Sequence, residues 1–271
     1  MAIIPVTREA HGARSWRRFS DYRFAAAVPL ARLAGAEIAQ AALSLPLVFA
    51  EADGKPVVAA LLGFRQGQNL FVGPDGRWLG RYVPAAFRGW PFQLARSGED
   101  RLTLCFDDAS GLLAGPGEGE PFFAEDGQPG PALRQVLDFL TRTQHSQAGA
   151  DAAAALLAEH GLLEPWPLKV RDGENERPVQ GLSRVSEAAL NGLSAEALKA
   201  LRDGSALALA YAQLLSMGNI GLLGQLAAAH AGAARQAQQK TPNGRDGELA
   251  AKLFRPDDGS GMIDWKKLLE E

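Results

Sequence analysis

Residues 45–63, LPLVFAEADGKPVVAALLG, indicate the fold class of this chain. Two apolar runs flank the turn Asp53-Gly54, and glycine accepts the positive φ that a tight turn between strands requires. The stretch therefore predicts an antiparallel β-hairpin. A second Asp-Gly turn, at residues 75–76, lies between short apolar runs, and residues 102–106 predict another strand. We expect antiparallel hairpins to dominate the first half of the chain.

Helical patterns dominate the second half. Apolar residues at i, i+3, i+4 and i+7 predict a helix over residues 132–144, and another is expected over 151–159. Ser194 is the expected N-cap of a helix that stops before Gly204, and Ala/Leu-rich helices are expected over 205–231. The expected fold is α+β, with the helices packing the sheet.

Three local patterns refine this expectation. An extra hairpin is predicted at 168–182, inside the helical half, so one hydrophobic core is expected rather than two. The Ala-rich residues 30–43 predict a helix, and residues 83–94 predict a short helix broken at Pro91. The expected organisation is an irregular arm (1–24), one α+β domain (25–231) and a flexible polar tail (232–271) with a short amphipathic end.

Composition excludes several classes of protein. The chain has 271 residues, of which 46% are hydrophobic and 22% charged, as in ordinary globular proteins. A net charge of −3 gives no field for binding nucleic acid. The single cysteine, Cys105, excludes an internal disulfide and a cysteine-only zinc site, and its apolar surroundings predict a buried thiol with a raised pKa. No secretory signal is recognised at the amino end, so a cytoplasmic location is expected.

One segment requires a membrane test. Residues 204–234 contain no Asp, Glu, Lys or Arg, a longer stretch than the roughly 20 residues that a spanning helix needs. The stretch is rich in alanine and glycine, however, and Gly218-Asn219 interrupts it. We therefore expect two short buried helices and no transmembrane span.

No motif for chemistry is found. The histidines at 11, 145, 160 and 230 lack metal-ligand spacing, no nucleophile elbow occurs, and the glycine-rich residues 115–120 are acidic where a phosphate would bind. We predict no catalytic residue, metal or cofactor. Paired carboxylates occur at Asp107-Asp108, and with arginines they are the basis of an alternative enzyme hypothesis.

Residues 65–94 combine arginines with six of the chain's 20 aromatic residues. Two interpretations stay open: aromatic rings that fill the core beneath arginine stems, or a recognition surface of the kind that dominates interface energetics. The candidate binding residues are Arg65, Asn69, Arg77, Trp78, Tyr82, Arg88 and Trp90.

The same segment resembles the bacterial SapC family. The matching runs are Leu61-Leu62-Gly63, residues 69–72 (NLFV), 75–80 (DGRWLG) and 82–85 (YVPA), with Arg88 and Pro91-Phe92. Residues 211–216 (YAQLLS) and Asn219 also look like the family. The resemblance implies no established catalytic residues. It associates the family with a surface layer, and with genes near flavin-dependent halogenase-like, cupin-like and TonB-dependent receptor genes.

The leading hypothesis is a non-catalytic binding or accessory protein that recognises a protein, a peptide or an acidic small molecule through the Arg/aromatic segment. Its expected partner is a protein or peptide, with the halogenase-like, cupin-like and TonB-dependent proteins as candidates. The alternatives are the enzyme described above and an exported surface-layer component at the cell surface.

Overall fold

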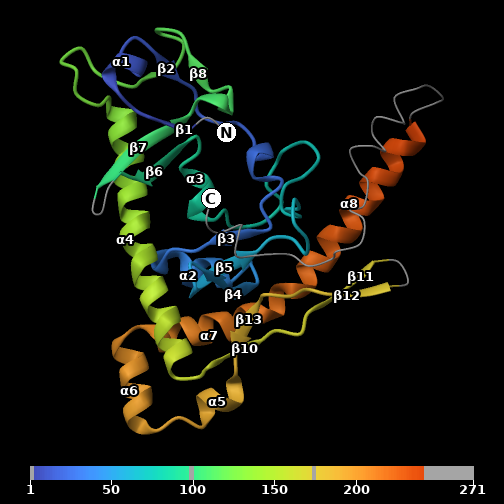
Figure 1. Cartoon of the computed structure of the whole chain (residues 1–271). Helices are drawn as coiled ribbons and strands as arrows, with labels where there is room; N and C mark the ends of the chain where they lie inside the picture. Colours follow the sequence, from blue (N-terminus) through green and yellow to red (C-terminus); the bar gives the residue numbers. More distant parts are fainter. Residues whose placement is uncertain (1–2, 98–100, 173–174, 241–271) are drawn as a thin grey trace.

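A computed structural model describes residues 3–97, 101–172 and 175–240 (Figure 1). The strands are β1 (Ile3–Pro5), β2 (Ser15–Trp16), β3 (Leu30–Arg32), β4 (Leu47–Ala52), β5 (Lys55–Leu61), β6 (Phe92–Arg96), β7 (Leu102–Asp107), β8 (Leu113–Ala114), β9 (Glu120–Pro121), β10 (Leu163–Pro165), β11 (Lys169–Asp172), β12 (Asn175–Pro178) and β13 (Ser183–Val185). The α-helices are α1 (Arg8–His11), α2 (Ile38–Ala42), α3 (Ala85–Arg88), α4 (Pro131–Glu159), α5 (Glu187–Asn191), α6 (Ala195–Asp203), α7 (Ala206–Ser216) and α8 (Ile220–Lys240). Short 3-10 turns are η1 (Arg23–Ala25), η2 (Gly35–Glu37), η3 (Asp108–Ser110) and η4 (Met217–Asn219).

The central sheet is antiparallel, with strand order β10-β13-β4-β5-β3. Its middle is the hairpin of β4 and β5 that the sequence predicts. Both turn residues have positive φ, 49° at Asp53 and 72° at Gly54, which matches the right-handed twist of the strands. The predicted α+β class is confirmed.

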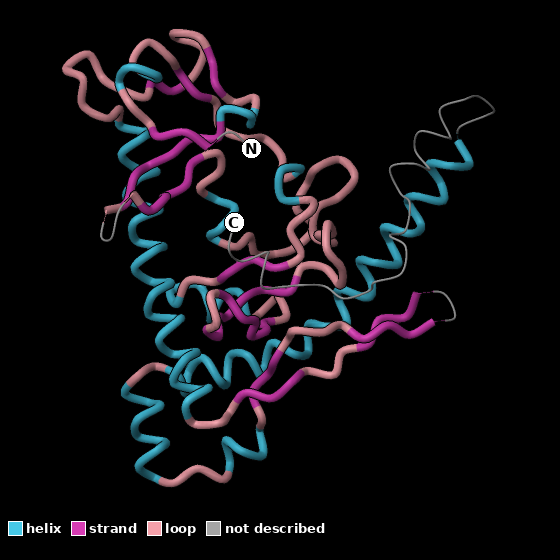
Figure 2. The backbone as a smooth tube through the Cα atoms, viewed as in Figure 1, coloured by secondary structure: helices cyan, strands magenta, loops and turns pink. Residues whose placement is uncertain are grey.

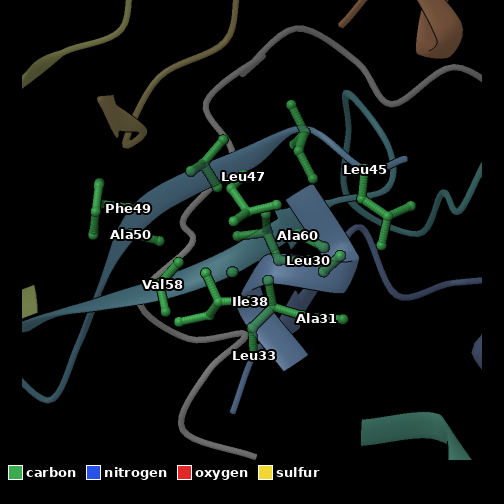
Figure 3. Packing of buried hydrophobic residues seen from close by; sticks show 14 of the residues in the cluster. Leu30, Ala31, Leu33, Ile38, Leu45, Leu47, Phe49, Ala50, Val58 and Ala60 are labelled. Carbon is green, nitrogen blue, oxygen red and sulfur yellow. The ribbon is translucent and has the colours of Figure 1, made fainter. Parts of the chain in front are cut away.

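A main hydrophobic cluster surrounds this sheet (Figure 3). Alternate residues of β4 and β5 point to opposite faces, yet nearly all are buried, because α4 and α7 cover the sheet. The core residues labelled in the figure are Leu30, Ala31, Leu33, Ile38, Leu45, Leu47, Phe49, Ala50, Val58 and Ala60.

A second cluster lies at the other end of the molecule. It packs between the sheets β1-β7-β6 and β8-β2-β9 and the start of α4. One core was expected, but the buried residues form two clusters, and α4 runs along one side of the molecule from one to the other (Figures 1 and 2). The residues of the second cluster are Trp16, Phe92, Phe106, Phe122, Ala132 and Leu133.

Several predicted element boundaries are wrong for identifiable reasons. Residues 131–159 form one helix instead of two, because Ser146 and Ala150 at the expected gap pack on η2, where the Ser146 hydroxyl accepts a hydrogen bond from Ala36 N–H at 2.7 Å. Residues 30–32 are a strand, because they pair with the open edge of β5. Within 83–94 the helix is only α3, and the chain then becomes β6 by pairing with β7.

The first residues also differ from the irregular arm that was expected. Strand β1 pairs with β7, and β2 pairs with both β8 and β9, so these residues are part of two sheets. The residues on either side of the second Asp-Gly turn, at 75–76, do not form two strands. They are paired by one isolated antiparallel bridge, between Val72 and Trp78. The hairpin of β11 and β12 and the N-cap at Ser194 are confirmed.

Helix α7 is attached to the sheet by polar side chains. The Gln213 side chain accepts a hydrogen bond from Val185 N–H at 2.9 Å and donates one to the Leu47 carbonyl at 3.2 Å. The Ser216 hydroxyl accepts from Leu47 N–H at 2.9 Å. These family-like residues therefore have a structural role.

The predicted interruption at Gly218-Asn219 is present as η4, which separates α7 from α8. Helix α8 is longer and more exposed than the short buried helix that was expected, and it continues to Lys240 through the stretch assigned to the tail. By length and composition alone, residues 206–236 could cross a bilayer. About a third of their most apolar stretch is buried in the fold, and one such helical segment is weak evidence for a membrane span. The amphipathic end at 262–271 lies outside the described residues.

Candidate binding site

The Arg/aromatic segment folds against residues 19–24 to form one aromatic cluster. Its members are Phe19, Tyr22, Phe24, Phe71, Trp78, Phe87 and Trp90, which are joined by ring-to-ring contacts. Phe71 and Trp78 stack with their centroids 5.4 Å apart, and Phe24 and Trp90 stack at 4.7 Å with nearly parallel planes. Phe71 and Phe87 are buried, whereas the other five rings are partly exposed. The cluster is therefore part of the core and also reaches the surface. Core packing is thus observed for part of the segment, and recognition through its exposed part stays a prediction.

Arg88, at the end of α3, lies beside this cluster. Its Nη2 donates a hydrogen bond to the Tyr82 hydroxyl at 3.1 Å and lies 3.6 Å from Oε2 of Glu37. The Cζ atom is 5.7 Å from the centroid of the Tyr82 ring and 5.4 Å from that of Phe139 on α4. The side chain is still 44% exposed, so the guanidinium is held in one orientation while part of it faces solvent.

Glu37, at the end of η2, holds Tyr82 and Arg88 in place through its buried carboxylate. The carboxylate is only 5% exposed and accepts hydrogen bonds from Ala34 N–H at 2.9 Å, Ala85 N–H at 2.7 Å and the Tyr82 hydroxyl at 2.8 Å. Burial, together with the hydrogen bond to Glu37 and its negative charge, raises the pKa of Tyr82 to about 12. Tyr82 therefore stays a neutral donor toward Glu37 at neutral pH.

Sequence reasoning missed Glu37. One signal could have found it: Glu37 is the only acidic residue between Asp21 and Glu51, in a stretch that is otherwise mostly apolar. A lone acid in such a stretch becomes buried when it has specific partners. Ala34 is a local partner, but the others, Tyr82, Ala85 and Arg88, come from a segment that the sequence did not connect to Glu37.

The structure brings Trp78, Tyr82, Arg88 and Trp90 together. Trp78 Nε1 donates to the Tyr82 carbonyl at 2.8 Å, which links the aromatic cluster to the Arg88 site. We define these four residues, with Glu37 and Phe24, as the Arg88 surface.

The other three candidate residues lie elsewhere. Asn69 is buried, and its side-chain amide donates to the Ala25 carbonyl and accepts from Phe71 N–H, both at 3.0 Å, so it supports the backbone. Arg77 is exposed and pairs with Asp75 within its own turn. Arg65 is exposed on the loop after β5. We leave these three out of the Arg88 surface.

The paired carboxylates follow Phe106 of the second cluster directly in the chain, at the end of β7 and the start of η3. Asp107 is buried and its Oδ1 caps η3 by accepting from Ala109 N–H at 3.0 Å. Oδ1 of Asp108 lies 3.8 Å from Nε2 of His11, and both atoms are buried with no hydrogen-bond partner among the residues that the structure describes. The other ring nitrogen of His11 accepts from Thr7 N–H at 3.3 Å, which places the proton of the neutral ring on Nε2, facing Asp108. Sequence spacing gave no reason to connect His11 with Asp108.

Metal and thiol chemistry find little support in the part of the chain that the structure describes. Among these residues, no group of three or more His, Cys, Asp or Glu side chains could hold a metal ion. Cys105 is buried in β7, and burial raises the pKa of its thiol, as the sequence predicts.

The fold defines an α+β protein in which the partly exposed Arg88 is held by Tyr82 and Glu37. The SapC family model matches residues 6–223, and the chain belongs to the SapC family. No curated protein and no solved structure matches the chain.

Proposed function

We propose that this SapC-family chain is a non-catalytic binding protein whose Arg88 surface captures a carboxylate group of a protein, peptide or small acidic molecule. The observation that carries the proposal is the state of Arg88, which is held by Tyr82 and by the carboxylate of Glu37 yet is 44% exposed. An arginine held in this way loses less rotamer freedom on binding than a free surface side chain.

The neighbouring rings supply the second part of a recognition surface. Arg88 lies over two aromatic faces, and Trp90, two residues further along the chain, is partly exposed in its stack with Phe24. Aromatic residues and arginine are the side chains that most often dominate binding energy at interfaces. A ligand with an acidic group next to an apolar group would use both features.

The test is affinity capture from a lysate of the protein's own host. We compare the unchanged chain, the double variant Arg88→Ala/Trp90→Ala, and Arg77→Ala as a matched control, because Arg77 is exposed but lies outside the Arg88 surface. We expect a partner that the double variant loses and the control keeps. A partner retained at equal yield by the folded double variant would refute the proposal.

Partner identity and location are part of the same proposal. We propose a cytoplasmic protein, with halogenase-like, cupin-like and TonB-dependent proteins as the first candidates to look for among captured partners. Cell fractionation tests the location, and recovery of the chain at the cell surface would favour the surface-layer alternative.

An enzyme remains a second candidate, favoured by the contact between His11 and Asp108. An imidazole with its proton directed at a carboxylate is an arrangement that general acid–base catalysis uses. The test is to find a metabolite that the chain converts and then to assay Asp108→Asn and Asp107→Asn. Binding without conversion would count against the enzyme.

A further inference from the structure

A cavity of about 420 Å³ lies between helix α7 and the end of the central sheet, separate from the Arg88 surface. Its polar side is formed by Glu164, Arg184 and Glu187, which belong to β10, β13 and α5. Its apolar side includes Leu215 of α7 and Met217 of η4. We call this cavity the α7 groove.

Two large side chains at the α7 groove, Tyr211 and Leu215, are exposed to solvent. Gln213 and Ser216 turn inward to the sheet, and this places Tyr211 and Leu215, one turn apart, on the outer face of α7. Their exposed fractions are 50% for Tyr211 and 79% for Leu215. Large side chains left open beside a cavity are typical of docking sites.

The charges at the groove favour positive side chains of an occupant at the rim. Arg184 pairs with Glu164 at 2.8 Å, so its positive charge is compensated. Glu187 adds a further negative charge at the rim, which leaves two carboxylates against one arginine. An occupant with apolar anchors and lysines next to them would match this rim.

The chain itself contains such a segment outside the described residues. Residues 262–271 read MIDWKKLLEE. Met262, Trp265 and Leu269 have the i, i+3, i+7 spacing with which amphipathic helices enter apolar grooves. Lys266 and Lys267 follow the tryptophan directly, where they would meet the carboxylates of the rim. Asp264, Glu270 and Glu271 outnumber these two lysines, so the charge match depends on the position of the lysines and not on the net charge of the segment.

The connection is long enough. Helix α8 begins directly after η4, at the edge of the groove, and its 21 residues lead away from it by about 32 Å. Residues 241–261 would span at most about 70 Å when extended. The segment can therefore return to the groove, and its tether gives it an effective concentration far above that of a free peptide.

We propose that residues 262–271 bind in the α7 groove of the same chain, with Trp265 next to Leu215 and Met217 and the lysines facing Glu164 and Glu187. The proposal does not depend on the function of the Arg88 surface.

The methionines provide a direct test in the full chain. The three methionines are Met1, Met217 in the groove and Met262 in the segment. Labelling their methyl carbons with ¹³C therefore gives one NMR signal for each of these three places. We expect Trp265→Ala to move the signals of Met217 and Met262 and to leave Met1 unchanged. Phe254→Ala, an aromatic change outside the segment, is the matched control and is expected to leave Met217 unchanged. A Met217 signal that ignores Trp265→Ala, or that responds equally to the control, would overturn the proposal.

Crosslinking tests the location independently. In a Cys105→Ala background, the pair Leu215→Cys and Leu268→Cys is expected to form an intrachain disulfide on the order of tenfold faster than the pair Lys169→Cys and Leu268→Cys. Lys169 is exposed at a different, apolar cavity lined by Trp166 and Leu182. Because Leu215 is mostly exposed, its replacement is not expected to disturb folding. Equal rates for the two pairs would refute the proposal, as would a crosslink found only between two chains, which would indicate a second copy as the occupant.

Discussion

Replacing Glu37 by alanine is the sharpest test of how the Arg88 surface is held together. The change removes a buried carboxylate and leaves Ala34 N–H, Ala85 N–H and the Tyr82 hydroxyl without their acceptor. Hydrogen bonds to a charged group contribute roughly 1.5–3 kcal/mol each and are not additive, so we expect a loss of about 3–5 kcal/mol in the free energy of unfolding. A typical domain has only about 5–15 kcal/mol in total.

The assay is urea denaturation followed by circular dichroism, with the midpoint and slope compared between variants. Glu125→Ala is the control, because Glu125 is exposed and such changes typically alter stability by less than about 0.5 kcal/mol. The slope should stay the same for all variants, since the surface exposed on unfolding is unchanged. A loss below about 1 kcal/mol for Glu37→Ala would show that the carboxylate does not hold this site.

Three other predictions test separate contacts. Gln213→Ala is expected to lower the free energy of unfolding by about 2–3 kcal/mol, because it leaves buried backbone groups of β4 and β13 unpaired; urea denaturation measures it, and an unchanged midpoint would contradict it. Gly80→Ala is expected to lower the free energy of unfolding by about 1–3 kcal/mol, because the new Cβ would lie 2.8 Å from the Phe71 ring. Gly221→Ala in α8 should raise it by up to about 1 kcal/mol, because its Cβ meets open space. The melting temperatures of the two variants should therefore move in opposite directions, and equal shifts would be inconsistent with these contacts. Because the pKa of Tyr82 is raised from 10.0 to about 12, folding favours the neutral phenol. The contribution of this phenol to stability is complete below about pH 10 and is lost as the pH rises through about 12. An ultraviolet titration should show this late ionisation and Glu37→Gln should move it to lower pH, whereas an unchanged titration would exclude Glu37 as a cause.

Local signals in the sequence predicted the elements whose causes are local. The hairpin at Asp53-Gly54 follows from turn chemistry within a few residues, and the cap at Ser194 follows from one side chain that accepts the hydrogen bond of Ala197 N–H. The sequence predicts two helices, over residues 132–144 and 151–159, whereas the structure has one, and the residues between them pack on η2 through the hydrogen bond from Ala36 N–H to Ser146.

The candidate site was predictable in part for the same reason. Four of its residues are close in sequence, and the local concentration of arginine and aromatic side chains is enough to predict them: Trp78, Tyr82, Arg88 and Trp90. Glu37 joins them from about 50 residues away, through a pairing that no spacing rule describes. The sequence predicts Asn69 as a binding residue, but its side-chain amide is occupied by the Ala25 carbonyl and by Phe71 N–H, and only the fold brings Ala25 to it.

The pairing of the first strands has a consequence for synthesis on the ribosome. Ile3 pairs with Asp107, and Ser15 pairs with Ala114 and Pro121, so β1 and β2 have no partners until about 100 more residues have been made. At about 5–20 residues per second this interval is about 5–20 s. Strands with open edges are prone to pair with other chains during that time. We therefore expect the folding yield to depend on the speed of translation before residue 121, and to rise when a chaperone covers the unpaired amino-terminal strands.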